Sequence, residues 1–159
     1  MSGRRPSFFD KLRALTPTQV LALGEAMILI TLAAPVIRLT PFRQVGKLAS
    51  FPVRRRVEDK QRRSDLIRNV SWAVDAASKH AKLRALCFEC GLTAQIMLRR
   101  RGVDSTLHFG AAPGHDKGLS AHVWVLADGY DVTGAAIAHT YAPLAVFPPE
   151  TDEKTATSS

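Results

Sequence analysis

The chain has 159 residues, of which 46% are hydrophobic and 23% charged, as expected for an ordinary globular domain with a buried core. Its two cysteines, Cys87 and Cys90, are too close in sequence for a disulfide-stapled scaffold, so we expect a reducing, cytoplasmic compartment. The formal net charge of +8 suits an acidic or anionic partner.

Residues 1–52 are expected to form a helical N-terminal region. The sequence TPTQ at residues 16–19 predicts a helix start with a capping box, and Pro35 predicts that this helix ends or bends there. A shorter helix should follow from Thr40 to about Leu48.

The apolar run at residues 20–37 raises the question of a membrane. At ~18 residues it is short for a bilayer span, and Glu25 in its middle is costly there. We therefore favour a helix that is buried or docked on a partner over a true span. Contact with a membrane surface through residues 8–37 remains open, and with it a membrane-associated location.

A core is expected over residues 53–148, followed by a disordered tail over residues 149–159. Residues 50–53 and the three arginines after them mark the boundary between the N-terminal region and the core. Apolar residues at helical spacing predict a helix over residues 57–80. A second helix should open on Cys87 and close at Gly102, since glycine commonly follows a helix C-terminus.

After Gly102 the apolar residues alternate, which predicts strands over residues 105–110, 120–127 and 130–133 with a loop at 111–119. Asp128-Gly129 predicts a two-residue hairpin turn. Residues 140–147 should add an edge strand interrupted by Pro143. The expected fold is α+β, with N-terminal helices first and then the Cys87 helix packed on an antiparallel meander.

Cys87 and His122 are the candidate catalytic pair. The positive end of a helix dipole stabilises a thiolate, and Cys87 stands at an expected helix start. His122 lies on a downstream strand, where its imidazole is a candidate base for the thiol. The alternatives are a buried, inert thiol and a structural histidine.

Cys90 completes a C-x-x-C motif, which suggests two other kinds of site. Thioredoxin-like redox chemistry expects the motif after a strand, whereas the residues before Cys87 follow a helical pattern. A zinc site needs two more ligands, and the sequence has no second C-x-x-C and no H-x-x-x-H. We expect no bound metal or cofactor and a packing role for Cys90.

A third residue should orient the imidazole, and Asp131 is the tentative candidate. In a simple two-residue hairpin Asp131 pairs with Leu126, which places it ~13 Å from His122 at ~3.4 Å per residue. A bulge or a different register would be needed to join them. The positions opposite His122 fall near Gly134 and Ala135, which have no polar side chain.

Two runs of arginine, at residues 54–56 and 99–101, contribute six of the 22 Lys and Arg residues. They are expected to form solvated faces, with an acidic or anionic partner as the alternative. Neither run is interleaved with aromatic residues, so we expect no nucleic-acid binding.

Three segments resemble one known family. They are C-x-x-C-x-L-x-A-x-x-x-L-R-R-R-G-V from Cys87, the strand A-H-V-W-V with the D-G turn after it, and the ending Y-A-P-L-A-V-F. Over about residues 65–147 the chain is similar to the lasso-peptide maturation proteases, transglutaminase-like cysteine peptidases that remove the leader from a lasso-peptide precursor.

The resemblance implies a transglutaminase/papain-like core with Cys87 as nucleophile and His122 as general base. The family commonly places an aspartate where this chain reads Val132-Thr133-Gly134, so Asp131, a backbone carbonyl or another side chain is left to orient His122. The implied partners are the precursor leader peptide, a separate winged-helix recognition protein and an ATP-dependent cyclase, which uses the ATP. The alternative functions are a non-catalytic peptide-binding scaffold of the same fold and a membrane-surface adaptor.

Overall fold

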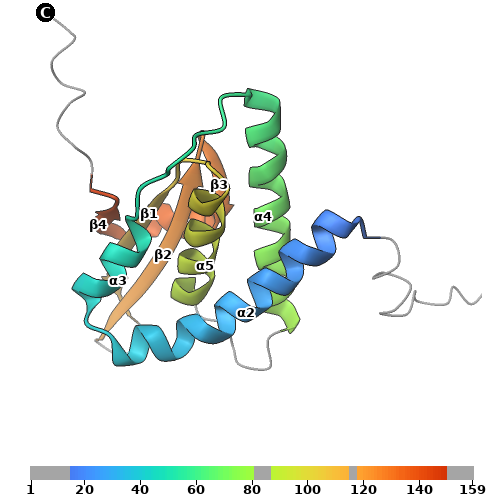
Figure 1. The fold of residues 1–159 in the computed structure, drawn as a ribbon. Helices are drawn as coiled ribbons and strands as arrows, with labels where there is room; N and C mark the ends of the chain where they lie inside the picture. Colours follow the sequence, from blue (N-terminus) through green and yellow to red (C-terminus); the bar gives the residue numbers. More distant parts are fainter. Residues whose placement is uncertain (1–14, 81–86, 115–117, 150–159) are drawn as a thin grey trace, which may run out of the picture.

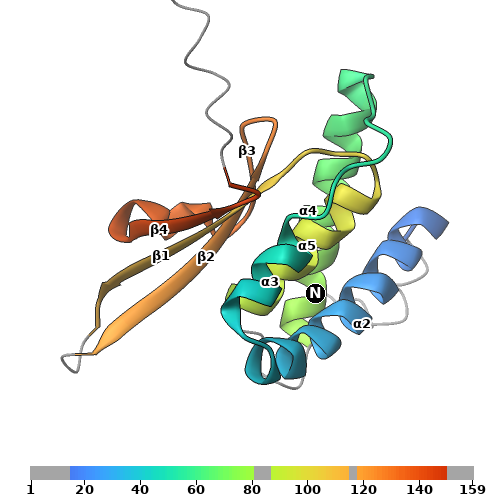
Figure 2. The same cartoon turned by 60° about the vertical axis from the view of Figure 1, so that its left-hand side comes forward.

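The structure is a computed structural model that describes residues 15–80, 87–114 and 118–149. In the described residues four α-helices lie on one side of an antiparallel sheet, with α4 and α5 against the strands and α2 packed on those two helices, which confirms the predicted α+β fold and the packing of the Cys87 helix on the sheet (Figures 1 and 2). The elements are α2 (Pro17–Leu39), α3 (Phe42–Ala49), α4 (Lys60–His80), α5 (Cys87–Arg100), β1 (Thr106–Pro113), β2 (Leu119–Ala127), β3 (Tyr130–Thr133), the 3₁₀ helix η1 (Ala135–Thr140) and β4 (Ala142–Phe147).

Several predictions concern residues at the two ends of the chain. Residues 8–14 of the predicted membrane-surface segment lie outside the described residues. The same holds for the predicted disordered tail, residues 149–159, apart from Pro149. The boundary between residues 52 and 53 stays a prediction.

The start of α2 is the predicted capping box. The Thr16 side chain accepts a hydrogen bond from the Gln19 N–H, and the Gln19 side chain accepts one from the Thr16 N–H. The helix does not end at Pro35 but continues to Leu39. Pro35 and Thr31 are both exposed, so water can satisfy the Thr31 carbonyl that loses its helical partner.

Only one face of α2 is buried. Ala22, Ala26 and Ile30 are at most 4% exposed, and α2 packs against α4 and α5. Glu25 forms ion pairs with Arg100, the last residue of α5, and with Arg101 just after it, so the acid in the apolar run has its counter-charges within the domain.

The opposite face of α2 leaves Leu21, Ile28 and Leu32 more than half exposed. By length and composition α2 is the one described helix that could cross a membrane, and the core helix of a soluble protein meets the same criteria. Docking on a partner and contact with a membrane surface therefore both remain open.

The start of α4 and the end of α5 are each fixed by a capping residue. Helix α4 starts at Lys60 rather than at 57, because the Asp59 side chain caps it by accepting from the Arg62 N–H at 2.5 Å. At the end of α5, Gly102 has a φ of 81°. Its N–H bonds to Arg99 O and the Val103 N–H bonds to Leu98 O, the arrangement of a Schellman cap.

The sheet has the strand order β3-β2-β1-β4. The Asp128-Gly129 turn is confirmed, since both residues have positive φ, as a type I′ hairpin requires. Strand β1 extends to Pro113, three residues into the predicted loop, because Pro113 pairs with Leu119. The predicted last strand is present, but it pairs with β1 rather than extending the meander from β3. The unpredicted η1 makes this crossover.

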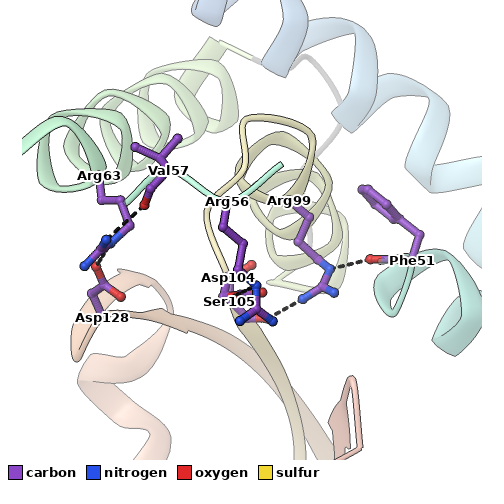
Figure 3. A network of polar contacts seen from close by, with 8 residues as sticks. All are labelled: Phe51, Arg56, Val57, Arg63, Arg99, Asp104, Ser105 and Asp128. Atoms are coloured by element: carbon purple, nitrogen blue, oxygen red, sulfur yellow. Dashed lines mark hydrogen bonds and ion pairs between the residues drawn. The ribbon is translucent and has the colours of Figure 1, made fainter. Parts of the chain in front are cut away.

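A buried glutamine on α5 joins the ends of three segments. Gln95 is fully buried, and its Nε2 lies 2.9 Å from Ala49 O, 3.1 Å from Ser105 O and 3.0 Å from Phe147 O. One turn later Arg99 donates to Phe51 O and to Ser105 O (Figure 3). These two side chains fix the residues after α3, the start of β1 and the end of β4 on α5.

We predict that Gln95→Leu lowers the free energy of unfolding by about 2–4 kcal/mol, because buried carbonyls lose their donor while the side-chain volume is kept. Urea titration measures the change. Gln44→Leu on the exposed side of α3 is the matched control and should change stability by less than about 0.5 kcal/mol. Equal unfolding midpoints for the two variants would contradict the prediction.

Candidate active site

Cys87 lies at the first described turn of α5, next to the strand that carries His122. Its thiol is partly exposed, and Sγ is 3.9 Å from the carbonyl oxygen of Ala121, the residue before His122. The close packing of α5 on β2 requires a glycine, since a Cβ on Gly91 would lie 2.5 Å from Val123 Cγ1. Helix and strand are therefore held together beside the candidate nucleophile.

His122 points to the other face of the sheet. Val123 and Val125 face α5, and successive strand residues alternate between faces, so His122 and Trp124 lie on the face away from the helices. Helix η1 covers this face (the orange-red turn in Figure 2). The His122 ring is 7% exposed and lies 4.9 Å from the Tyr141 ring and 6.1 Å from the Trp124 ring, centroid to centroid.

Both candidates nevertheless lie at the same edge of β2. The Val123 carbonyl points toward Gly134, just past the end of β3. The Ala121 carbonyl, two residues earlier on the strand, points to the same edge and is the group that Cys87 approaches. No hydrogen bond joins Cys87 Sγ to the His122 ring in the described part of the chain. The structure brings the two residues to one strand edge, with the strand backbone between them.

A backbone carbonyl holds the His122 ring. Nε2 of His122 lies 2.7 Å from Gly134 O. A carbonyl oxygen can only accept, so Nε2 carries the proton and, in the neutral ring, Nδ1 is the basic nitrogen. A backbone carbonyl was one of the groups left open by the sequence, and Gly134 is at one of the positions expected opposite His122.

Asp131 pairs with Leu126, as predicted for the hairpin, and its carboxylate accepts from the Ala135 N–H at 3.1 Å. A bulge follows, because Val125 pairs with Thr133 and leaves Val132 as an extra residue. Asp131 thus holds the turn that presents the Gly134 carbonyl. Its role as third catalytic residue stays a prediction.

Cys90 has the environment of a packing residue. Its side chain is 8% exposed, and burial together with the nearby Glu89 raises the pKa of the thiol to about 11. A buried thiol with a raised pKa is almost fully protonated at pH 8, so Cys90 is poorly suited to act as the nucleophile. Both cysteines are free, and no cluster of three or more metal-ligating side chains occurs among the described residues.

Sequence patterns did not reveal the parts of the site contributed by the backbone or by crossover segments. Gly134 acts through its carbonyl, which no side-chain pattern can reveal, and its need for glycine is visible only in the structure, where its φ is 83°. Tyr141 follows η1 and lies within 3.3 Å of the Ser120 hydroxyl, a contact across 21 residues. The Y-A-P-L-A-V-F segment could have pointed to this residue.

Comparison with protein families matches residues 26–146 to a family described as the transglutaminase-like superfamily. The match covers most of the chain, from the middle of α2 to the end of β4. It is not specific to lasso-peptide proteases. Searches of curated proteins and of solved structures found no match.

We predict that Gly134→Ala loosens the His122 ring. The added Cβ would lie 2.6 Å from Val123 O and 3.3 Å from His122 Nε2, and alanine is strained at this φ. We expect a loss of about 1–3 kcal/mol in the free energy of unfolding and loss of the slowly exchanging imidazole N–H signal in NMR spectra. Gly24→Ala in α2 is the control, because nothing lies within 4 Å of its added Cβ, and it should be neutral or stabilising. A Gly134→Ala protein that keeps the imidazole signal would refute this role.

We also predict that iodoacetamide at pH 8 modifies Cys87 at least about tenfold faster than Cys90, since Cys90 is buried and its pKa is about 11. Peptide mass spectrometry of the folded protein distinguishes the two sites. In urea both thiols should react at similar rates. Faster modification of Cys90 in the folded protein would reverse the assignment of the accessible thiol.

Proposed function

The chain belongs to the transglutaminase-like superfamily, and we propose that it is a cysteine peptidase that removes the leader from a lasso-peptide precursor before macrolactam closure. The superfamily includes cysteine peptidases and transglutaminases. The observation that carries the proposal is a partly exposed Cys87 thiol at the edge of the strand that bears His122. The lasso-protease motifs around Cys87, His122 and Tyr141 support the choice of substrate.

In the proposed reaction, His122 Nδ1 takes the proton from Cys87 Sγ, and the thiolate attacks the carbonyl carbon of the leader–core peptide bond. As the C–N bond breaks, Nδ1–H protonates the departing amine. A water molecule then gives a proton to Nδ1 and attacks the thioester, which releases the leader and restores the thiol. Backbone N–H groups at the start of α5 are the proposed donors to the oxyanion.

This mechanism requires the imidazole to come within hydrogen-bond distance of the thiol. Catalytic hydrogen bonds are often long in unliganded enzymes and shorten when the substrate binds. Cys87 Sγ and the His122 ring both lie at the edge of β2 that continues past the end of β3. To reach the thiol, the imidazole would therefore have to move around this one strand edge. Before this movement the Gly134 carbonyl holds the proton on Nε2, which leaves Nδ1 as the basic nitrogen.

The proposed partners are the precursor leader, a separate winged-helix recognition protein and an ATP-dependent cyclase, in the cytoplasm. The exposed apolar side chains of α2 are available to one of these proteins or to a membrane surface. A non-catalytic peptide-binding scaffold is the alternative function. The observation that favours it is the lack of a thiol–imidazole hydrogen bond in the described part of the chain.

We predict that Cys87→Ala and His122→Gln each reduce leader cleavage at least about 10³-fold in the presence of the recognition protein. Cys90→Ala, one helical turn away, should stay within a few-fold of wild type, because Cys90 only packs. Mass spectrometry of the precursor and its products provides the measurement, and thermal unfolding checks that each variant folds.

Equal cleavage by wild type, Cys87→Ala and Cys90→Ala would rule out the peptidase. Loss in Cys90→Ala alone would move the nucleophile to Cys90. An intact precursor that binds wild type and Cys87→Ala equally would establish the scaffold function.

A further inference from the structure

The two arginine runs, 45 residues apart in sequence, meet in space. The linker after α3 docks on the end of α5, where the Val57 N–H donates to Gly102 O at 2.9 Å. Gly102 is required at this contact, because a Cβ there would collide with the Arg55 carbonyl. The linker arginines (Arg54, Arg55, Arg56) and the helix-end arginines (Arg99, Arg100, Arg101) therefore line one pocket.

The pocket has a volume of about 1010 Å³ and is strongly cationic. Arg62 from α4 joins the two runs, so seven arginines line it against two acidic residues, Glu58 and Asp59. Phe51, Pro52 and Val57 supply an apolar part of the lining. Like charges this close repel one another, so a bound anion would be favoured.

Four of the seven arginines already have partners within the domain. Arg99 is 7% exposed and donates to Phe51 O and Ser105 O, and burial lowers its pKa from the ordinary value (Figure 3). Arg56 pairs with Asp104 at 3.0 Å. Arg100 and Arg101 pair with Glu25.

Three guanidinium groups at this pocket have no such partner. The side chains of Arg54, Arg55 and Arg62 are exposed, and none of them makes a hydrogen bond or ion pair to the described residues. Their forked donors match the two oxygens of a carboxylate. They are the groups available to a ligand.

We infer that this pocket is an exosite that binds an acidic peptide segment. Phe51 is the single aromatic residue in the pocket lining, and the Arg99 guanidinium lies over one face of its ring, 5.8 Å from the centroid, so the pocket lacks the series of aromatic side chains on which successive nucleic-acid bases stack. Glu58 and Asp59 would repel a continuous phosphate backbone, whereas a peptide can place its carboxylates selectively. The apolar lining suits the side chains between those carboxylates.

The exosite is separate from the candidate active site. Cys87 and the helix-end arginines lie at opposite ends of α5, whose 14 residues span ~20 Å. An extended peptide covers that distance in about six residues. If the proposed peptidase function holds, the acidic segment of its substrate lies at least about six residues from the cleaved bond.

Binding can be tested without catalysis. Fluorescence anisotropy with a labelled ten-residue peptide that alternates Glu and Ala measures binding to the full chain carrying Cys87→Ala. The same peptide with Gln in place of Glu is the neutral control. We expect saturable binding of the Glu peptide that weakens as salt rises from about 50 to 200 mM, and at least tenfold weaker binding of the Gln peptide.

The decisive comparison uses two charge-matched double variants. Arg54→Glu/Arg62→Glu should weaken binding at least about tenfold, since each guanidinium would be replaced by a repelling carboxylate. Arg38→Glu/Arg43→Glu makes the same change in net charge at exposed positions outside the pocket and should alter binding by less than about threefold. All four arginines are exposed, so both variants should keep the wild-type unfolding temperature.

Equal weakening in the two double variants would overturn the exosite, because binding would then reflect net charge alone. Equal binding of the Glu and Gln peptides would do the same. A single-stranded RNA oligonucleotide that displaces the Glu peptide at a lower concentration than unlabelled Glu peptide would reassign the pocket to nucleic acid. Because no step requires peptide cleavage, failure of the exosite and failure of the peptidase are separate results.

Discussion

The arrangement of the domain depends on two polar side chains, Gln95 and Arg99, one turn apart on α5. Between them they donate to the carbonyls of four residues: Ala49, Phe51, Ser105 and Phe147. Buried carbonyls need hydrogen-bond donors, and the carbonyls that Gln95 and Arg99 satisfy belong to segments up to 52 residues away from Gln95. These hydrogen bonds hold α5 against the sheet and so determine where Cys87 lies relative to β2. Arg99 also lines the pocket of the proposed exosite, so the candidate active site and the exosite both depend on α5.

Features decided by a few neighbouring residues were predictable from the sequence. The capping box at Thr16, the glycine after α5 and the Asp128-Gly129 turn each follow from local backbone chemistry. Features decided by distant segments were not. Strand β4 crosses to β1, and η1 closes the far face of the sheet, because of contacts that no local pattern encodes. The meeting of the two arginine runs has the same origin, since it depends on the fit of Arg55 against Gly102.

The candidate site was predictable in its residues but not in its geometry. Spacing and motif singled out Cys87 and His122 but did not decide which face of the sheet His122 would take. The structure decides it, because Val123 and Val125 pack on the side of α5 and the alternation of the strand then places His122 on the opposite face. The partner of the imidazole could not be recognised from side-chain chemistry, because Gly134 contributes only a carbonyl.

That carbonyl changes what the imidazole can do. A carboxylate fixes the tautomer and also stabilises the imidazolium by its charge, whereas a carbonyl fixes the tautomer and offers only a dipole. The bulge at Val132 and the bond from the Ala135 N–H to Asp131 place this dipole, so the carboxylate in the hairpin acts on the backbone rather than on the ring. Charge stabilisation of the proposed thiolate–imidazolium pair must then come from elsewhere. One such source is the start of α5, because Cys87 is the first residue of this helix and the N-terminal end of a helix dipole favours a negative charge.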